Sequence, residues 1–287
     1  MPLASMHLLL SLVVGLSLDP QVVPPTPAAP ALPSAPPISI AYPDDPRLDM
    51  ALGMMRKGSF EVAALTAQTV LKSRAEVERA YAVLGIARNK LKQYEAARAA
   101  LEKANASKQE FPERRHVPHF LGWCCFHLGD MDAARAAFTE HLKRVPDEPD
   151  STFGLALVAL SEDQLDEAQA LFEKALEGFS KPTPKPVDQA RVWTRMADLA
   201  LRRDDVVRAE SLLQQAIQAS ALQHETWAKV ARVKDRLGKT AEADAARANE
   251  RRILEALGRT AVTAPTAAPA LVPSTQQDAQ APKKGTP

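Results

Sequence analysis

Small and large apolar residues recur through the middle of the chain at a spacing of 34 residues. Ala134 is followed four residues later by Phe138, and the pair returns 34 residues further on as Ala168 and Phe172. The small-residue column is repeated at the same spacing by two further pairs, Ala63 with Ala97 and Ala209 with Ala243. Since a repeat of this length accommodates two short helices and their turns, the pattern predicts an all-α array of antiparallel helix pairs.

Glycine and proline divide this array into units. Gly58, Gly129 and Gly238 are expected in the turn within a repeat, where the chain needs a left-handed backbone conformation. Two spacings are longer than 34 residues, and the additional residues fall near the prolines of segments 111–112 and 181–186. The columns and these insertions predict six units, at approximately 44–77, 78–111, 115–148, 149–182, 190–223 and 224–257.

The last predicted helix departs from the pattern of the others. Arg247 and Glu250 take places where earlier units carry apolar residues, while Ile253, Leu254 and Leu257 keep a single apolar stripe. A terminal repeat needs a polar outer face, so this helix is predicted to cap the array.

The segment from Leu121 to Pro146 carries the columns of a known repeat. It has a Leu-Gly pair, then Ala134 and Phe138, with Cys125 where the pattern has an aromatic residue. The chain therefore resembles the tetratricopeptide repeat family over about three quarters of its length. The resemblance implies a right-handed superhelical solenoid whose first helices line the concave side.

The two ends of the chain differ from the middle, because sixteen of its 23 prolines fall in residues 1–46 and 265–287. Residues 1–18 contain an apolar run of 11 residues, with Gly15 and Ser17 at its end, and are expected to be a signal peptide. The alternatives are an apolar tail or a mis-assigned start. Proline-rich residues 19–43 are predicted to be a linker and residues 258–287 a disordered tail.

Charge and motif chemistry exclude several classes of function. The net charge is +1, which gives no nucleic-acid-binding signature. The chain has no nucleophile elbow, phosphate-binding glycine loop or Cys-x-x-Cys motif, so no catalytic residue, cofactor or enzyme activity is expected. His116 and His119 lack a third ligand in phase on their helix, and no metal site is expected.

The first helices of the array are predicted to form a partner-binding groove. Their inward positions are apolar and aromatic in the third and fourth units and rich in arginine in the fifth and sixth. The predicted groove residues are His119, Trp123, Phe126, Phe153, Leu157, Arg191, Arg195 and Arg202. Alternatively, the aromatic members of this set pack between neighbouring units as part of the core.

These observations predict a non-enzymatic scaffold that holds a peptide or amphipathic helix of another protein, one with an acidic end. If residues 1–18 are a signal peptide, the protein is exported or periplasmic, and resemblance to exported members of the family suggests a role in assembling a cell-envelope complex. The alternatives are a cytosolic adaptor and a structural protein that dimerises through its terminal repeats. No stable membrane span is expected.

Overall fold

The computed structural model describes residues 44–258, and within them the chain forms twelve α-helices and one short 3-10 helix. The expectations for a signal peptide, a linker and a tail lie outside these residues, apart from Gly258. The helices are α1 (Pro46–Arg56), α2 (Phe60–Ser73), α3 (Glu78–Lys90), α4 (Tyr94–Ala106), α5 (Val117–His127), α6 (Met131–Arg144), α7 (Pro149–Ser161), α8 (Leu165–Ser180), α9 (Pro186–Arg202), α10 (Val206–Ala219), α11 (His224–Arg236) and α12 (Thr240–Ala256); the 3-10 helix Arg114–His116 precedes α5.

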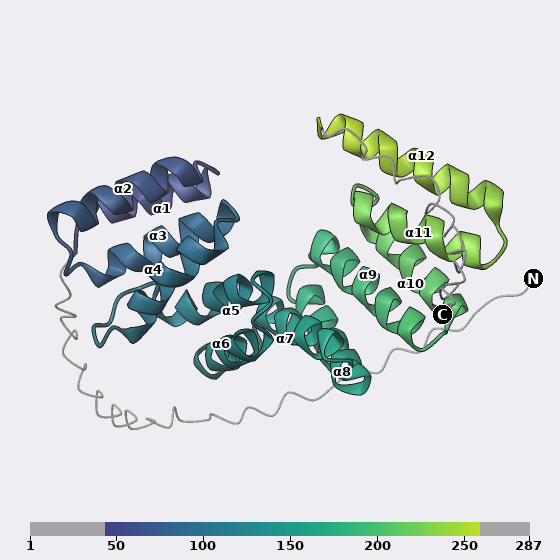
Figure 1. Ribbon diagram of the computed structural model, residues 1–287, viewed down its shortest axis with the longest axis horizontal. Helices are drawn as coiled ribbons and strands as arrows, with labels where there is room; N and C mark the ends of the chain where they lie inside the picture. The colour runs from purple at the N-terminus through teal and green to yellow at the C-terminus, as the bar shows by residue number, and fades with distance from the viewer. Residues whose placement is uncertain (1–43, 259–287) are drawn as a thin grey trace, which may run out of the picture. The chain divides into compact units, whose positions relative to one another are not determined.

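The helices form six consecutive pairs that stack in chain order (Figure 1). Each helix packs mainly against the one before and the one after it, and first helices of adjacent units also touch, as α5 does with α3 and α7. The described residues contain no strand. The predicted all-α solenoid of helix pairs is therefore confirmed.

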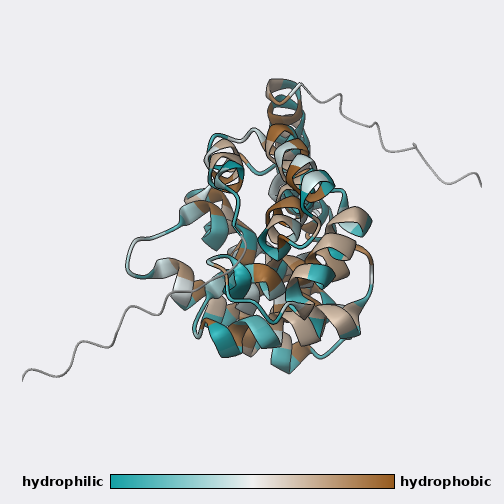
Figure 2. Cartoon of the chain, turned by 90° about the vertical axis from the view of Figure 1, so that its left-hand side faces the viewer, coloured by the Kyte–Doolittle hydropathy of each residue, from teal (hydrophilic) through white to brown (hydrophobic). Residues whose placement is uncertain are grey.

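Large apolar side chains fill the space between the helices of successive units. Leu101, Phe138, Phe172 and Leu213 are each no more than 1% exposed, as their column in the repeat predicts. Burying a side chain of this size contributes about 1.5–3 kcal/mol, and such contacts carry most of the stability of the array. Apolar and polar residues alternate around individual helices, the pattern of amphipathic helices that bury one face (Figure 2).

Phe138 is packed directly against the backbones of two first helices. A Cβ atom placed on Gly122 of α5 would lie 2.6 Å from the ring, and one placed on Gly154 of α7 would lie 2.5 Å from it. The Leu-Gly column thus has a direct cause, because only glycine lets both helices approach this ring.

Left-handed residues end the first helix of every unit. Gly58, Gly129 and Gly238 have φ values of 80°, 80° and 71°, as predicted. The other three units place a side chain in the same conformation, with φ near 60° at Lys92, Asp163 and Asp204. The turn geometry is therefore common to all six units even where the glycine signal is missing.

Prolines occupy the first turn of four first helices, α1, α5, α7 and α9. Proline suits this position because its missing N–H would have no partner there and its φ is already helical. α9 begins at Pro186, four residues before the approximate start of 190 that the spacing suggested. The extra turn follows from the same preference, with Asp188 adding a favourable carboxylate in the first turn.

Candidate binding groove

Two cavities lie along the first helices, and together they contain all eight predicted groove residues. The first, of about 300 Å³, is lined by residues of α3 to α5, α7 and α9. Seven of the predicted residues border it: His119, Trp123, Phe126, Phe153, Leu157, Arg191 and Arg195.

The second cavity, of about 580 Å³, lies between α5, α7, α9 and α11 and contains the eighth residue, Arg202. Phe126, Leu157 and Arg195 line both cavities, so the two form one continuous surface along five successive units, from the second to the sixth. We refer to this surface as the groove.

The aromatic end of the groove is fixed by edge-to-face contacts. The Trp123 ring lies 5.3 Å from the ring of Phe138 and 5.9 Å from that of Phe126, at interplanar angles of 78° and 85°. Its indole Nε1–H donates to Asp150 Oδ2 over 3.1 Å. Trp123 and Phe126 remain partly exposed, so they offer apolar surface from a rigid position.

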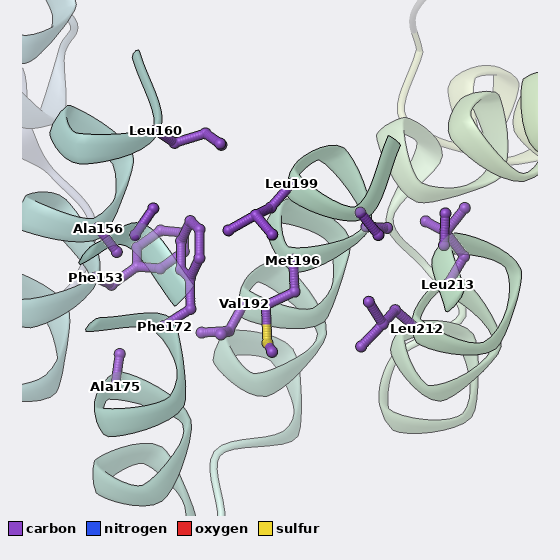
Figure 3. Close-up of a cluster of buried hydrophobic side chains, with 14 of the residues drawn as sticks. Phe153, Ala156, Leu160, Phe172, Ala175, Val192, Met196, Leu199, Leu212 and Leu213 are labelled. Atoms are coloured by element: carbon purple, nitrogen blue, oxygen red, sulfur yellow. The ribbon is translucent and has the colours of Figure 1, made fainter. Parts of the chain in front are cut away.

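Phe153 has a different role from the other aromatic residues of the set. Its side chain is 2% exposed, and it packs in the core with Phe172 at a ring distance of 5.9 Å (Figure 3). The guanidinium of Arg191 covers its remaining surface, 4.9 Å from the ring centroid. Of the two sequence interpretations, the core one therefore describes Phe153, whereas Trp123 and Phe126 face the groove. Sequence spacing could not distinguish core from groove positions among these aromatic residues, because a shift of one residue in the phase of the helix exchanges the two.

The predicted arginines of the groove form ion pairs with carboxylates of their own chain. Arg191 Nη1 lies 3.1 Å from Asp188 and 3.6 Å from Asp150. Arg195 pairs with Asp198 and Glu225, and Arg202 with Asp163. These contacts hold the side chains in place and reduce the charge that each presents to a ligand.

The second cavity is basic in spite of these pairs. Its charged lining consists of one acidic residue, Asp198, and five basic ones: Arg195, Arg202, Lys229, Arg232 and Arg236. Lys229 is 7% exposed and is held by Asp198 at 2.6 Å. Arg232 is exposed, and no carboxylate of residues 44–258 lies within ion-pair distance of it.

A cluster of histidines lies beside the aromatic end of the groove, around a third cavity of about 370 Å³. His116 and His119 at the start of α5 meet His141 of α6 there, and His141 is 1% exposed. Burial lowers the pKa of all three rings, and for His141, which also faces the other two, to about 4. No sequence motif connects His141 with His119, because it lies on another helix, 22 residues further along the chain.

The two cysteines are buried in α5 and are free thiols. Burial raises the pKa of Cys125, and it raises that of Cys124 to about 11. At neutral pH both are protonated, so they act as small apolar side chains rather than as nucleophiles.

The stacked helix pairs, with cavities along their first helices, define the class of the protein as a helical-repeat solenoid. A sequence profile described as tetratricopeptide repeat matches residues 48–113, 108–149 and 153–224, more than half of the chain. The chain belongs to the tetratricopeptide repeat family. Proteins of this family are generally non-catalytic scaffolds, and the fold suggests a role in protein–protein interaction.

One relative is cellulose synthase operon protein C of Xanthomonas axonopodis pv. citri (strain 306), which is 30% identical over 99 residues. The match covers 34% of this chain and 6% of that protein, so the chain spans only a small part of its relative.

Solved structures with low sequence identity share the fold. The structure of PilW, a widely conserved type IV pilus biogenesis factor, superposes with a TM-score of 0.59 at 17% identity and covers 74% of this chain and 96% of that one. The structure of pilF of Pseudomonas aeruginosa superposes with a TM-score of 0.56 at 19% identity and covers 73% of this chain and 90% of that one. Cut9–Hcn1 of the APC/C gives a TM-score of 0.62 at 15% identity, covering 72% of this chain and 39% of that one.

No helix of residues 44–258 combines the length and the apolar character that crossing a membrane requires.

Proposed function

We propose that the protein is a non-enzymatic scaffold that binds a segment of another protein in the groove. The observation that carries this proposal is the continuity of the two cavities through Phe126, Leu157 and Arg195. A single bound segment would meet fixed aromatic side chains at one end and a basic cavity at the other. Aromatic residues and arginine are the residue types that dominate binding energy at protein interfaces.

The groove chemistry favours a segment with apolar side chains followed by an acidic end. Apolar side chains would contact Trp123, Phe126 and Leu157, which are partly exposed. A carboxylate would meet Arg232 without competing with an existing ion pair, whereas Arg195 and Arg202 already have acidic partners. Recognition by charge at this end would weaken as ionic strength rises, because exposed charges are screened.

We place the scaffold in the assembly of a cell-envelope complex. Two solenoids of similar fold are described as a type IV pilus biogenesis factor and as pilF, and the matching relative is a cellulose synthase operon protein. The proposal also requires export by residues 1–18. Mass spectrometry of the N-terminal peptide, on protein purified from its native cells, tests whether residues 1–18 are removed. An intact Met1 in the cytosolic fraction would support the alternative of a cytosolic adaptor.

Site-specific photo-crosslinking in the native cells tests the groove. A crosslinking amino acid at Leu157, between the two cavities, should capture a defined partner. The same group at Val207, which is 69% exposed on the second helix α10, should not. Arg232→Glu should abolish the Leu157 adduct, while Arg208→Glu, an exposed arginine outside the groove, should leave it unchanged. Equal adducts at both positions would refute the proposal.

Self-association through the first unit is a second candidate, favoured by the exposed apolar residues of that unit. Met50 of α1 is 59% exposed, and Val62 and Leu65 of α2 are 49% and 62% exposed. Sedimentation velocity over a range of concentrations tests it. A dimer that becomes a monomer in Leu65→Glu would support this candidate, and a wild-type monomer at all concentrations would remove it.

A further inference from the structure

Three potential metal ligands meet at the junction of α5, α6 and α7. His119 comes from the first turn of α5, His141 from the last turn of α6, and Glu148 from the residue that caps α7. Each can offer one ligand atom so that all three atoms lie within 4.8 Å of one another. Two imidazoles and a carboxylate are a ligand set that zinc accepts in proteins.

Both histidines turn the same ring nitrogen toward a common point. His119 Nδ1 and His141 Nδ1 each lie 2.8 Å from Ser151 Oγ, and Glu148 Oε2 lies 4.0 Å from His119 Nδ1. The carboxylate is itself oriented, because Glu148 Oε2 accepts a hydrogen bond from the Ser151 backbone N–H over 2.7 Å. The two imidazoles therefore converge from separate helices on one small hydroxyl group, and the carboxylate is held beside them by the backbone of the same serine.

The opposite nitrogen of each ring has a partner of its own. His119 Nε2 lies 3.4 Å from Asp150 Oδ2, and His141 Nε2 lies 3.3 Å from His116 Nδ1. Metal-binding histidines nearly always have such a second partner, which fixes the tautomer and the ring orientation. This arrangement leaves both Nδ1 atoms as the ligand atoms.

The cluster is also accessible. His116, His119, His141 and Glu148 all line the third cavity, of about 370 Å³, which gives an ion a route to the ligands. The described part of the chain therefore provides ligands, second partners and an entry path, which a metal site requires.

We propose that His119, His141 and Glu148 bind a divalent metal ion of the zinc class, with Ser151 Oγ or a water molecule as the fourth ligand. Zinc–ligand bonds of about 2.0–2.2 Å bring tetrahedral ligand atoms to about 3.4 Å from one another, so the present spacing has to contract on binding. Rotation of the two rings and of the carboxylate toward one another would supply this contraction. From the sequence, no metal site was expected, because that argument was limited to ligands on one helix. The proposed site takes its ligands from three elements instead.

The ion would join α5, α6 and α7 next to the aromatic end of the groove, but the site does not depend on the proposed partner. Without metal, the same residues can form a hydrogen-bonded His–Ser–His link instead. The two interpretations differ in what Ser151 does, since the link cannot form without its hydroxyl, whereas a water molecule can take its place as the fourth ligand of the ion.

The test is a titration of the tag-free full-length protein with Co²⁺, followed by competition with Zn²⁺. We expect one Co²⁺ per chain, with the intense visible bands of a tetrahedral site, and displacement by one equivalent of Zn²⁺. Asp150→Asn, which removes a second partner, should weaken binding by about 10–100-fold. Absence of saturable one-to-one binding in the wild type would overturn the proposal.

Ligand variants and matched controls locate the ion. His141→Ala and Glu148→Gln should each abolish the tetrahedral spectrum. If His141→Ala does not fold, Glu148→Gln still provides the test, because the glutamine side chain keeps an oxygen that can cap α7. Ser151→Ala should retain binding, as should His127→Ala, which changes an exposed histidine at the other end of α5. An undiminished spectrum in Glu148→Gln, or its loss in His127→Ala, would contradict the assignment.

Discussion

The packing of Phe138 between two glycines predicts that alanine at either glycine has two opposing effects on stability: a gain from its higher helix propensity and a loss from overpacking the core. The perturbation is Gly154→Ala in the interior of α7. Alanine is favoured over glycine inside a helix by about 1 kcal/mol, so an unhindered substitution should stabilise the protein. At this position, however, the new Cβ would lie 2.5 Å from Phe138 Cζ and 2.6 Å from Cε2.

The ring has little freedom to move away from α7. Another side of it contacts Gly122 of α5, where an added Cβ would lie 2.6 Å from Cδ1, and Phe138 is fully buried. Overpacking of a filled core costs about 1–3 kcal/mol. Subtracting the gain in propensity, we expect Gly154→Ala to lower the free energy of unfolding by about 0–2 kcal/mol.

Gly53→Ala is the matched control, because the only atom near an added Cβ on that α1 residue is Arg56 Nη2, at 3.8 Å. This variant should raise the free energy of unfolding by about 1 kcal/mol. Urea unfolding followed by far-ultraviolet circular dichroism measures both variants. In a double-mutant cycle, Phe138→Leu should reduce the cost of Gly154→Ala by about 1 kcal/mol or more. Equal stabilisation by the two alanines would refute the reasoning.

Three further predictions concern other parts of the array. Lys92→Gly relieves a left-handed backbone and should stabilise the protein by about 0.5–1 kcal/mol, whereas Lys57→Gly, at a negative φ one position earlier in the equivalent turn, should destabilise it; urea unfolding distinguishes them. Arg79→Met should cost about 3 kcal/mol in the same assay, because the guanidinium is 4% exposed and its removal leaves Glu113, which is 13% exposed, without a partner, whereas the more exposed Asp44 and Asp49 can be solvated by water. The hydrogen bond from Arg47 lowers the pKa of Asp45 to about 2. The ionised carboxylate therefore stabilises the fold at a pH above its ordinary pKa, and this contribution is lost as the pH falls toward 2. Asp45→Asn should remove that part of the pH dependence of unfolding, and an unchanged acid transition would contradict the assignment.

The repeat was predictable because each unit applies the same packing solution. A small residue on the first helix admits a large one from the second, so Gly85 with Leu101 and Gly122 with Phe138 recur as columns in the sequence. The helix pairs follow from these columns and from the turns, which sequence spacing alone locates to within a few residues.

The fate of single side chains was harder to predict than the fold. An arginine is ordinarily exposed, but Arg79 of α3 is buried and forms ion pairs with Asp44, Asp49 and Glu113. Its partners lie 30 to 35 residues away, in adjacent units, and no local pattern connects them. The position of His141 beside His119 was unpredictable for the same reason, since a site assembled from several helices leaves no spacing motif in any one of them.

The nearest-neighbour packing of the helices has a consequence for how the chain acquires its structure. Helices that make substantial contact are at most two apart in chain order, so within residues 44–258 only the contacts of the last unit have to wait for the last helix. Chains dominated by local contacts fold quickly, and repeat arrays can nucleate in one unit and propagate. During synthesis each helix pair can therefore dock on the preceding one as soon as it leaves the ribosome. Any export that needs an unfolded chain has to be faster than this docking.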